Sequence, residues 1–459
     1  MSTLPVQEEI KDLIHARRWA ELKDAISGRV APEIAGMLAT LDPAERMLLF
    51  RALPRDRQSE VFAYLEDPQQ NELLKNLTNE DARRILAELT PDDRTALLEE
   101  LPAEVTQRLM ALLNPEDLRE ARTLLGYPEE SVGRLMTPDA VATRPDWTIQ
   151  QAIDHIRTHG RDAETVNMIY VVDERGRLID DLRLRQILLA DPHATVESIL
   201  DRTFTSLRAT DDREEAVRVM KQYDRVALPV VDSGGYLLGI VTSDDVLDVA
   251  EAEATEDIQK MAGMEALDMP YMRTPFFEMV RKRGGWLSAL FLGEMLTATA
   301  MGYFENEIGR AVVLALFIPL IISSGGNSGS QAASLIIRAM AVQEIRVRDW
   351  WRVMSREIAA GLALGAILGS IAMLRILLWP TRETLYGPHY FLVALTVSVS
   401  LVGVVTWGTL AGSMMPFVFR ALGFDPAVSS SPFVATLVDV TGIVIYFTVA
   451  LVTLRGTLL

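Results

Sequence analysis

SPFVATLVDVTG, residues 431–442, places one carboxylate, Asp439, inside an apolar run that extends from 432 to 454. The run is long enough to span about 30 Å of hydrocarbon, and an acid at its middle costs roughly 2.5–3.5 kcal/mol on insertion scales. Ser431, Ala435 and Asp439 recur every four residues, so they share one helical face. Either a hydroxyl of a neighbouring helix satisfies a buried Asp439, or Asp439 is a cation site on a permeation path. The second reading is favoured because intramembrane carboxylates usually mark ion or proton pathways.

Apolar stretches elsewhere in the second half of the chain predict a multi-pass membrane protein. The five predicted spans lie near 285–303, 308–324, 354–379, 390–412 and 432–454. Basic residues precede the first span and crowd the loop between the second and third: Arg281, Lys282, Arg283, Arg338, Arg346, Arg348, Arg352 and Arg356. Because such loops stay inside, we expect a protein of the cell (inner) membrane with a cytoplasmic N-terminus.

Charge is distributed unevenly along the 459 residues, of which 49% are hydrophobic at a mean hydropathy of +0.15. Residues 284–459 carry nine acidic and ten basic side chains, a net charge of +1, so residues 1–283 carry −19 of the total of −18. An acidic surface argues against nucleic acid as a partner and for solvation or cation binding. The chain has no cysteine, and its N-terminal residues show no signal peptide, so we expect the first half to be cytosolic.

An internal repeat marks residues 1–126 as an all-α superhelix. Leucines recur every twelve residues, at Leu41, Leu53, Leu65, Leu77, Leu89, Leu101 and Leu113. Each is followed by helix-start residues such as Asp42-Pro43 or Asn114-Pro115, which predict an N-cap with proline at the first helical position. Such short helices must stack to bury their apolar faces.

Residues 127–250 contain a second repeat, of α/β character. The segments MIYVVDERGRLIDDLRLRQIL and ALPVVDSGGYLLGIVTSDDVL each predict a strand, a turn with glycine, a second strand and a helix start. The tandem resembles a pair of CBS motifs, which commonly sense adenine nucleotides, so the resemblance implies ATP as a ligand of this pair. The first copy departs from the motif at Asp180, Asp181, Arg183 and Gln186.

An acidic connecting helix is predicted to join this pair to the membrane, with residues 251–283 as the connecting segment and 284–459 as the membrane domain. The run SDDVLDVAEAEATEDIQKMAG carries many acids and little Lys or Arg, so a cationic partner should compensate it. The chain shows neither a phosphate-binding loop of the GxxxxGK[ST] type nor a nucleophile elbow, and we expect no enzyme.

PLIISSGGNSGSQAAS, residues 319–334, is predicted to break a helix at membrane depth. Consecutive glycines and an asparagine favour irregular backbone, which lipid tolerates only where it is buried or lines a water-filled cavity. A kink in the helix core is the alternative.

The whole chain resembles the MgtE family of magnesium channels, in which a PxxxxxGGNxGxQ signature and a closing ATLxDVTG span occur. The matching residues are Gly325, Gly326, Asn327, Gly329, Gln331 and Ala435 to Gly442. The order of parts agrees as well, and so do GYPEESVGRLMTP at 126–138 and LDVAEAEATEDI at 247–258. Ser330 and Ser431 stand where many members have asparagine.

The resemblance implies a homodimeric Mg²⁺ channel closed by cytosolic Mg²⁺. It makes Asp439 the pore metal site, with the Ala435 carbonyl, Asn327, Gln331, Gly325 and Gly326 beside it. It implies regulatory Mg²⁺ at Asp224, Asp245, Asp248, Glu253, Glu256 and Asp257, with Asp92 or Asp93 from the superhelix. Mg²⁺ prefers octahedral oxygen ligands and gives up water reluctantly, so a twofold pore with two Asp439 carboxylates suits it.

Two alternatives from other classes stay open. In a secondary carrier that exchanges Mg²⁺ for Na⁺ or H⁺, Asp439 and Glu294 would alternate between cation and proton. A membrane-tethered nucleotide sensor without transport conflicts with Asp439 and the glycine run. In the channel reading, Glu294 is expected to matter less, because it would reach an interface or a Ser or Thr hydroxyl.

Overall fold

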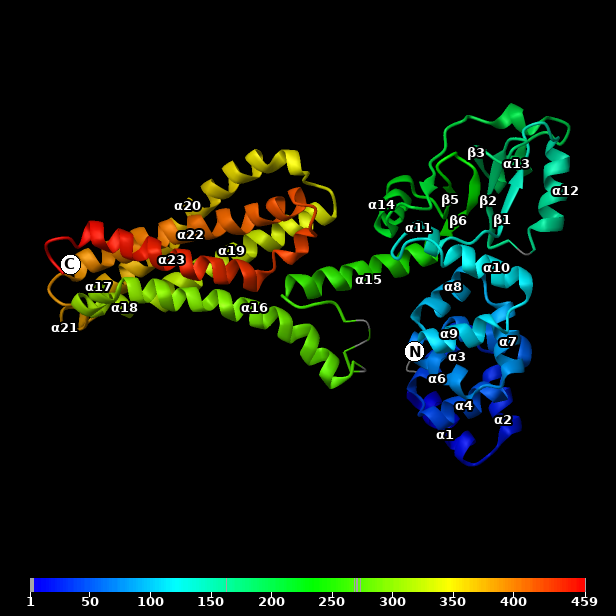
Figure 1. Cartoon of the computed structure of the whole chain (residues 1–459), viewed down its shortest axis with the longest axis horizontal. Helices are drawn as coiled ribbons and strands as arrows, with labels where there is room; N and C mark the ends of the chain where they lie inside the picture. Colours follow the sequence, from blue (N-terminus) through cyan, green and yellow to red (C-terminus); the bar gives the residue numbers. More distant parts are fainter. Residues whose placement is uncertain (1–3, 162, 268, 270, 273, 459) are drawn as a thin grey trace. The chain divides into compact units, whose positions relative to one another are not determined.

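The computed structural model describes residues 4–161, 163–267, 269, 271–272 and 274–458 (Figure 1). The chain forms two compact units, Met1–Glu251 and Ala252–Leu459. Each unit is taken by itself below.

Short helices build the N-terminal part of the first unit (Figure 1). They are α1 (Leu4–His15), α2 (Trp19–Ser27), α3 (Ala31–Thr40), α4 (Pro43–Ala52), α5 (Arg55–Ala63), α6 (Asp67–Asn76), α7 (Asn79–Glu88), α8 (Pro91–Glu100), α9 (Ala103–Met110) and α10 (Pro115–Leu124). Alternate helices pack on one another, α3 with α5, α5 with α7 and α4 with α6. The predicted helical repeat is confirmed.

The leucine spacing sets the helix ends. Leu41, Leu53, Leu77, Leu89 and Leu101 each directly follow the last residue of a helix. Asp42 closes a capping box with Glu45, and Asn114 accepts from the backbone of Glu116 and Asp117. At Pro54 and Pro102 the prediction of proline at the first helical position is wrong. Each proline is the N-cap residue itself, with extended backbone (φ −54°) just before the helix begins.

Two three-stranded sheets follow, one for each sequence repeat. The first copy consists of β1 (Ala140–Thr143), α12 (Ile149–His159), β2 (Thr165–Val172), β3 (Leu178–Arg183) and α13 (Leu184–Leu189), preceded by α11 (Val132–Leu135). The second consists of β4 (Leu207–Arg208), α14 (Arg213–Tyr223), β5 (Ala227–Val231), β6 (Leu237–Thr242) and α15 (Ser243–Met261), preceded by the 3-10 turn η1 (Val196–Ile199). In both copies the first strand is parallel and the third antiparallel to the middle one.

Bridges join the two copies into one α/β module. Thr137 pairs with Ile240 and Arg177 pairs with Tyr236 in isolated antiparallel bridges. Gly239 makes the first approach feasible, since a methyl group there would collide with the Thr137 carbonyl. The predicted tandem α/β pair is confirmed.

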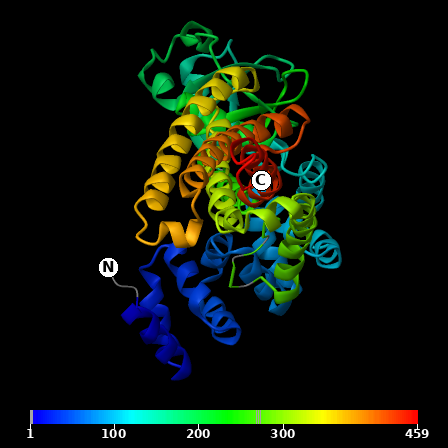
Figure 2. The same ribbon diagram turned by 90° about the vertical axis from the view of Figure 1, so that its left-hand side faces the viewer.

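The second unit is an all-helical bundle. Its elements are α16 (Phe276–Tyr303), α17 (Glu305–Arg310), α18 (Val312–Ala315), α19 (Ile318–Ala341), η2 (Val347–Asp349), α20 (Trp350–Leu377), α21 (Arg382–Tyr386), α22 (Tyr390–Ala421), η3 (Pro426–Val428) and α23 (Ser431–Thr453). Helix α22 packs against α19, α20 and α23, and α16 packs against α23. Seen toward the end that holds the C-terminus, α20 and α16 lie on opposite sides of the bundle (Figure 2).

Four segments among the described residues are long and apolar enough to cross a membrane: Val312–Ala341, Val347–Leu377, Tyr390–Ala421 and Ser431–Thr453. They overlap four of the five predicted spans. The first predicted span lies within α16, which is a 28-residue helix but is not among the four.

The predicted break at the glycine run is wrong. Helix α19 continues through residues 325–329, and the irregular backbone comes earlier, between α17 and α19. The glycines serve close packing instead: a methyl at Gly325 would meet Val404 at 2.5 Å, and one at Gly329 would meet the Gly408 carbonyl at 2.8 Å. Two helices can approach this closely in a membrane only where side chains are absent.

Candidate cation sites

Asp439 lies in the middle of α23 and faces two other helices. A methyl built on Gly326 of α19 would lie 3.9 Å from Asp439 Oδ1, and the side chain of Glu294 of α16 is close enough to that of Asp439 for the two carboxyl groups to interact. The two carboxyl groups thus meet where three helices converge. Glu294 therefore has a carboxyl neighbour, where the sequence predicted an interface or a hydroxyl.

The other predicted pore residues are divided between two faces of α19. Gly326 faces Ala435, whose Cβ would lie 3.6 Å from a methyl at Gly326. Asn327 and Gln331 are exposed on the protomer, and Asn327 Nδ2 donates to Ser323 Oγ at 3.4 Å. Gly325 points instead toward α22 and is buried there. Asp439, Ala435 and Gly326 are thus brought together, and Gly325 is not.

A group of acids gathers in the first unit around the start of α15. Asp92 and Asp93 open α8, Asp245 stands in the first turn of α15, and Glu164 precedes β2. Thr242 Oγ1 donates to Asp245 Oδ2 at 2.7 Å. Asp92 Oδ1 is buried and has no hydrogen-bond partner among the described residues. We call Asp92, Asp93, Glu164, Asp244, Asp245 and Asp248 the acidic group.

Mutual repulsion and burial disfavour the charged forms in this group. Burial, and then the charge of Asp92, raise the pKa of Asp245 to about 8 and that of Glu164 to about 7. The same two causes raise the pKa of Asp93 to about 6. A cation placed among these carboxylates would reverse the penalty.

The sequence predicted Asp92, Asp93, Asp245 and Asp248 as metal-binding residues but missed Glu164 and Asp244. Asp244 stood in the acidic run without a role, and no motif pointed to Glu164, which joins the group through the fold of the first CBS copy. Across the described ranges, no three Asp, Glu or His side chains are close enough to enclose a metal ion.

The remaining predicted regulatory acids lie elsewhere. Asp224 ends α14 with left-handed backbone (φ 48°) and is exposed. Glu253, Glu256 and Asp257 lie on the part of α15 that belongs to the second unit. Burial, and then the charge of Asp425, raise the pKa of Asp257.

Lys260 supplies the cationic partner that the acidic helix was predicted to need. Its Nζ lies 2.5 Å from Glu256 and 2.8 Å from Asp425 of η3. Just beyond the helix, Gly263 packs against Trp286 and Pro432, and Trp286 Nε1 donates to Ser430 Oγ at 3.2 Å. The segment after α15 is thus held against the first residues of α23, about two helical turns from Asp439.

The turn between β3 and α13 forms one cavity of the CBS pair, of about 290 Å³. Its lining is polar throughout: Asp181, Arg183, Arg185, Gln186, Asp201, Thr203 and Arg225. Arg225 Nη2 pairs with buried Asp181 Oδ1 at 3.2 Å. Asp180, which replaces the glycine of the motif, accepts from the backbone N–H groups of Asp181, Asp201 and Arg202.

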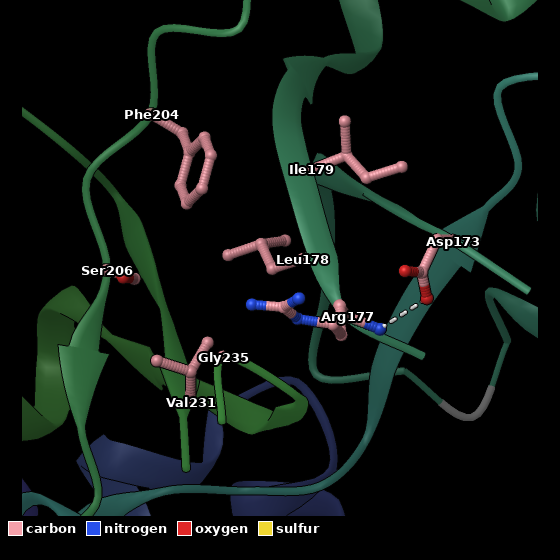
Figure 3. A pocket seen from close by; sticks show the side chains of 8 residues that line it. All are labelled: Asp173, Arg177, Leu178, Ile179, Phe204, Ser206, Val231 and Gly235. Atoms are coloured by element: carbon pink, nitrogen blue, oxygen red, sulfur yellow. Dashed lines mark hydrogen bonds between the residues drawn. The ribbon is translucent and has the colours of Figure 1, made fainter. Parts of the chain in front are cut away.

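A second cavity, of about 420 Å³, lies between the two strand turns (Figure 3). Leu178 and Ile179 of β3, Phe204 and Val231 give it apolar walls, and the Arg177 side chain reaches into it from the turn (Figure 3). The Arg177 backbone N–H donates to Asp173 Oδ1, which fixes this turn.

A helical-repeat module with a CBS pair, joined to a bundle of apolar helices, defines a multidomain membrane protein. Family profiles match three parts of the chain: the MgtE intracellular N domain at residues 31–130, the CBS domain at 132–193 and 196–252, and the MgtE divalent cation transporter at 318–449.

Curated relatives agree with these profiles. The magnesium transporter MgtE of Thermus thermophilus is 42% identical over 75% of this chain and 74% of its own length. That of Enterococcus faecalis is 33% identical over 74% and 73%. A crystal structure of the cytosolic domain of the Mg²⁺ channel MgtE in complex with ATP matches with a TM-score of 0.50 at 36% identity, over 53% of this chain and 99% of that one. The chain belongs to the MgtE family.

Proposed function

We propose that this protein is a homodimeric, Mg²⁺-selective channel that mediates Mg²⁺ uptake and is closed by cytosolic Mg²⁺. The observation that carries the proposal is Asp439, a carboxylate in the middle of an apolar helix that faces Gly326 of the glycine signature. The relatives are named as magnesium transporters, a transport function rather than catalysis.

The proposed topology has five spans, with α16 as the first. Basic residues at 281–283 and in the loop before α20 place these segments on the cytoplasmic side, together with the N-terminal unit. The proposed domains are 1–126, 127–250, 251–283 and 284–459. Within the proposed connecting segment, 251–283, α15 ends at Met261, and residues 262–275 lie outside helices where the structure describes them.

A twofold dimer is proposed because one Asp439 is a weak site for a divalent ion. Twofold assemblies are the most common homo-oligomers, and this one would place two Asp439 carboxylates about the pore axis. Asn327 and Gln331 are exposed on the protomer, as residues that face a pore or a second protomer must be.

Closure is proposed to follow from Mg²⁺ binding to the regulatory acids: Asp92, Asp93, Asp224, Asp245, Asp248, Glu253, Glu256 and Asp257. Bound Mg²⁺ would offset the repulsion among them, and several weak sites add to a steep response because each favours the closed state by RT ln(1 + [L]/Kd). The contact of Lys260 with Asp425 gives α15 a path to α23.

ATP fits the first CBS cavity poorly. A nucleoside base needs apolar or aromatic contact, whereas the lining near Arg225 is wholly polar and contains the pair with Asp181. At the matching turn of the second copy, Asp245 belongs to the acidic group and would repel phosphate. These two turns therefore do not favour ATP. The larger cavity does offer apolar walls, with Phe204 among them, and the Arg177 side chain, which are the contacts that a base and a phosphate need, so ATP at the CBS pair stays part of the proposal.

The rival function is a secondary carrier that exchanges Mg²⁺ for Na⁺ or H⁺, and the contact of Glu294 with Asp439 is the observation that favours it. Recordings from planar bilayers separate the two. A channel gives unitary current steps whose reversal potential follows the Mg²⁺ gradient alone. Flux without unitary steps, coupled to proton or Na⁺ movement, would establish the carrier.

The same recordings test regulation. Open probability should fall as cytosolic Mg²⁺ rises, and the triple variant Asp224→Asn, Asp248→Asn, Glu253→Gln should respond to Mg²⁺ differently while still conducting. Open probability that is independent of cytosolic Mg²⁺ in the wild type would refute the sensor.

A further inference from the structure

Glu294 is a second acid that the bundle brings to Asp439. At Gly293 helix α16 touches α23 so closely that a methyl group would lie 3.0 Å from Thr436 Cγ2. The next residue, Glu294, therefore lies beside Asp439, which is one turn further along α23, and the two carboxyl groups are close enough to interact. Two acids from distant parts of the sequence therefore stand at the same depth of the bundle.

No basic side chain of the packed helices neutralises this pair. Within α19, α22 and α23 the basic residues are Arg338 and Arg420, each near the end of its helix. Arg338 lies at least twelve residues from Gly326 along α19, and Arg420 lies at least twelve residues from Trp407 along α22. Twelve residues of helix correspond to about 18 Å. For the residues that the structure describes, neither Glu294 nor Asp439 has a salt bridge to Lys or Arg.

A second feature near Glu294 also calls for a polar ligand. Thr297, one turn after Glu294 on α16, has a buried Oγ1 that finds no hydrogen-bond partner among the described residues. Opposite, Gly326 leaves room beside Asp439, because no side chain fills that position. The hydroxyl oxygen of Thr297 and the two carboxyl groups are oxygen donors of the kind that a hard cation prefers, and Gly326 leaves space beside Asp439.

We propose that Glu294 and Asp439 together hold the permeating divalent cation, and that Glu294 sets the selectivity among divalent cations. The inference rests on the proposed function, since Asp439 must lie on the cation path. A second carboxylate strengthens the local field and favours direct contact with the ion in place of contact through its water shell. Mg²⁺ dehydrates reluctantly, so direct contact benefits softer, more readily dehydrated ions such as Mn²⁺.

The test uses the full-length protein in liposomes, with Mg²⁺ and Mn²⁺ influx as one readout and Mn²⁺ binding, followed by electron paramagnetic resonance, as the other. Glu294→Gln should weaken Mn²⁺ binding by about tenfold or more and lower the ratio of Mn²⁺ to Mg²⁺ influx, since the loss even of a group that only orients a metal ligand typically costs about 10- to 100-fold in affinity. Glu294→Asp keeps the charge and should retain more of the binding. Glu305→Gln, on the short helix α17, is the matched control and should change neither readout.

The outcomes separate this inference from the proposed function. If Glu294→Gln binds Mn²⁺ as the wild type does and keeps its influx ratio, while Asp439→Ala abolishes influx, Glu294 is not part of the site and the pore assignment stands. If Asp439→Ala still transports Mg²⁺ at the original rate, the proposed function itself fails. Should Glu294→Gln not fold, Glu294→Ser, which also lacks the carboxylate, takes its place, and wild-type Mn²⁺ binding with an unchanged influx ratio in that variant would equally overturn the inference.

Discussion

Asp439 illustrates how one residue can carry a function without supporting the fold. A carboxylate in an apolar helix costs free energy, and the nearby Glu294 adds a like charge, so the removal of Asp439 should not destabilise α23. We predict that Asp439→Ala abolishes Mg²⁺ influx while the purified protein keeps its oligomeric state and melting temperature. Influx into liposomes and size-exclusion chromatography check the two halves, and Glu307→Ala on the short helix α17 is the control.

Arg225 is the opposite case, because it neutralises a buried charge. The Asp181 side chain is 3% exposed, and burial raises its pKa although Arg225 opposes this. Arg225→Met leaves Asp181 without its cation and should cost about 3–5 kcal/mol of stability in the CBS pair. Thermal unfolding of the variant measures this loss, and the double variant with Asp181→Asn should recover part of it. A double variant no more stable than Arg225→Met would show that the pair is not the cause.

At the scale of elements, α15 is the piece that can report the state of the acids to the bundle. Lys260 ties its C-terminal end to Asp425, and both side chains are partly exposed. We predict that Lys260→Met raises the ratio of open to closed channel at saturating cytosolic Mg²⁺ by at most about fivefold, since such a pair contributes about 1 kcal/mol or less. Patch recordings measure the ratio, and Lys221→Met on the exposed face of α14 is the control. A lower open probability in Lys260→Met than in the wild type would show that the contact favours the open channel, contrary to the role proposed for α15.

At the scale of the whole molecule, the acidic group makes the stability of the first unit depend on pH and Mg²⁺. The pKa values of Asp93, Glu164 and Asp245 are raised to between about 6 and about 8, so folding favours their protonated forms. Without divalent cations, the unit should therefore lose stability as the pH rises from about 4 to about 8, where these groups ionise. Added Mg²⁺ should restore it, most strongly at the upper end.

Protease protection of the first unit in the full-length protein measures both effects. The Asp245→Asn variant should show a weaker pH dependence, because it lacks the acid with the highest pKa of the three. Protection that is the same at pH 5 and pH 8, with or without Mg²⁺, would mean that the acidic group is merely solvated.

The sequence by itself determined the parts and their order. Twelve-residue leucine spacing, two α/β repeats and four apolar runs each encode a local element through periodicity, and all are present in the structure. Asp439 also stood out from sequence, because a charge in an apolar run is costly wherever the helix packs. The first span was harder to assign, since Glu294 and the small residues of α16 lower its hydropathy.

What only the tertiary structure decided is which distant residues meet. Glycines at 325–329 predicted a broken helix, yet they keep α19 intact and let α22 approach, because absent side chains serve close packing as well as irregular backbone. Nothing local to Glu294 or Glu164 shows that one lies beside Asp439 and the other beside Asp92 and Asp245. Such contacts depend on helix packing and strand pairing between segments far apart in the chain, and periodicity within a segment carries no information about them.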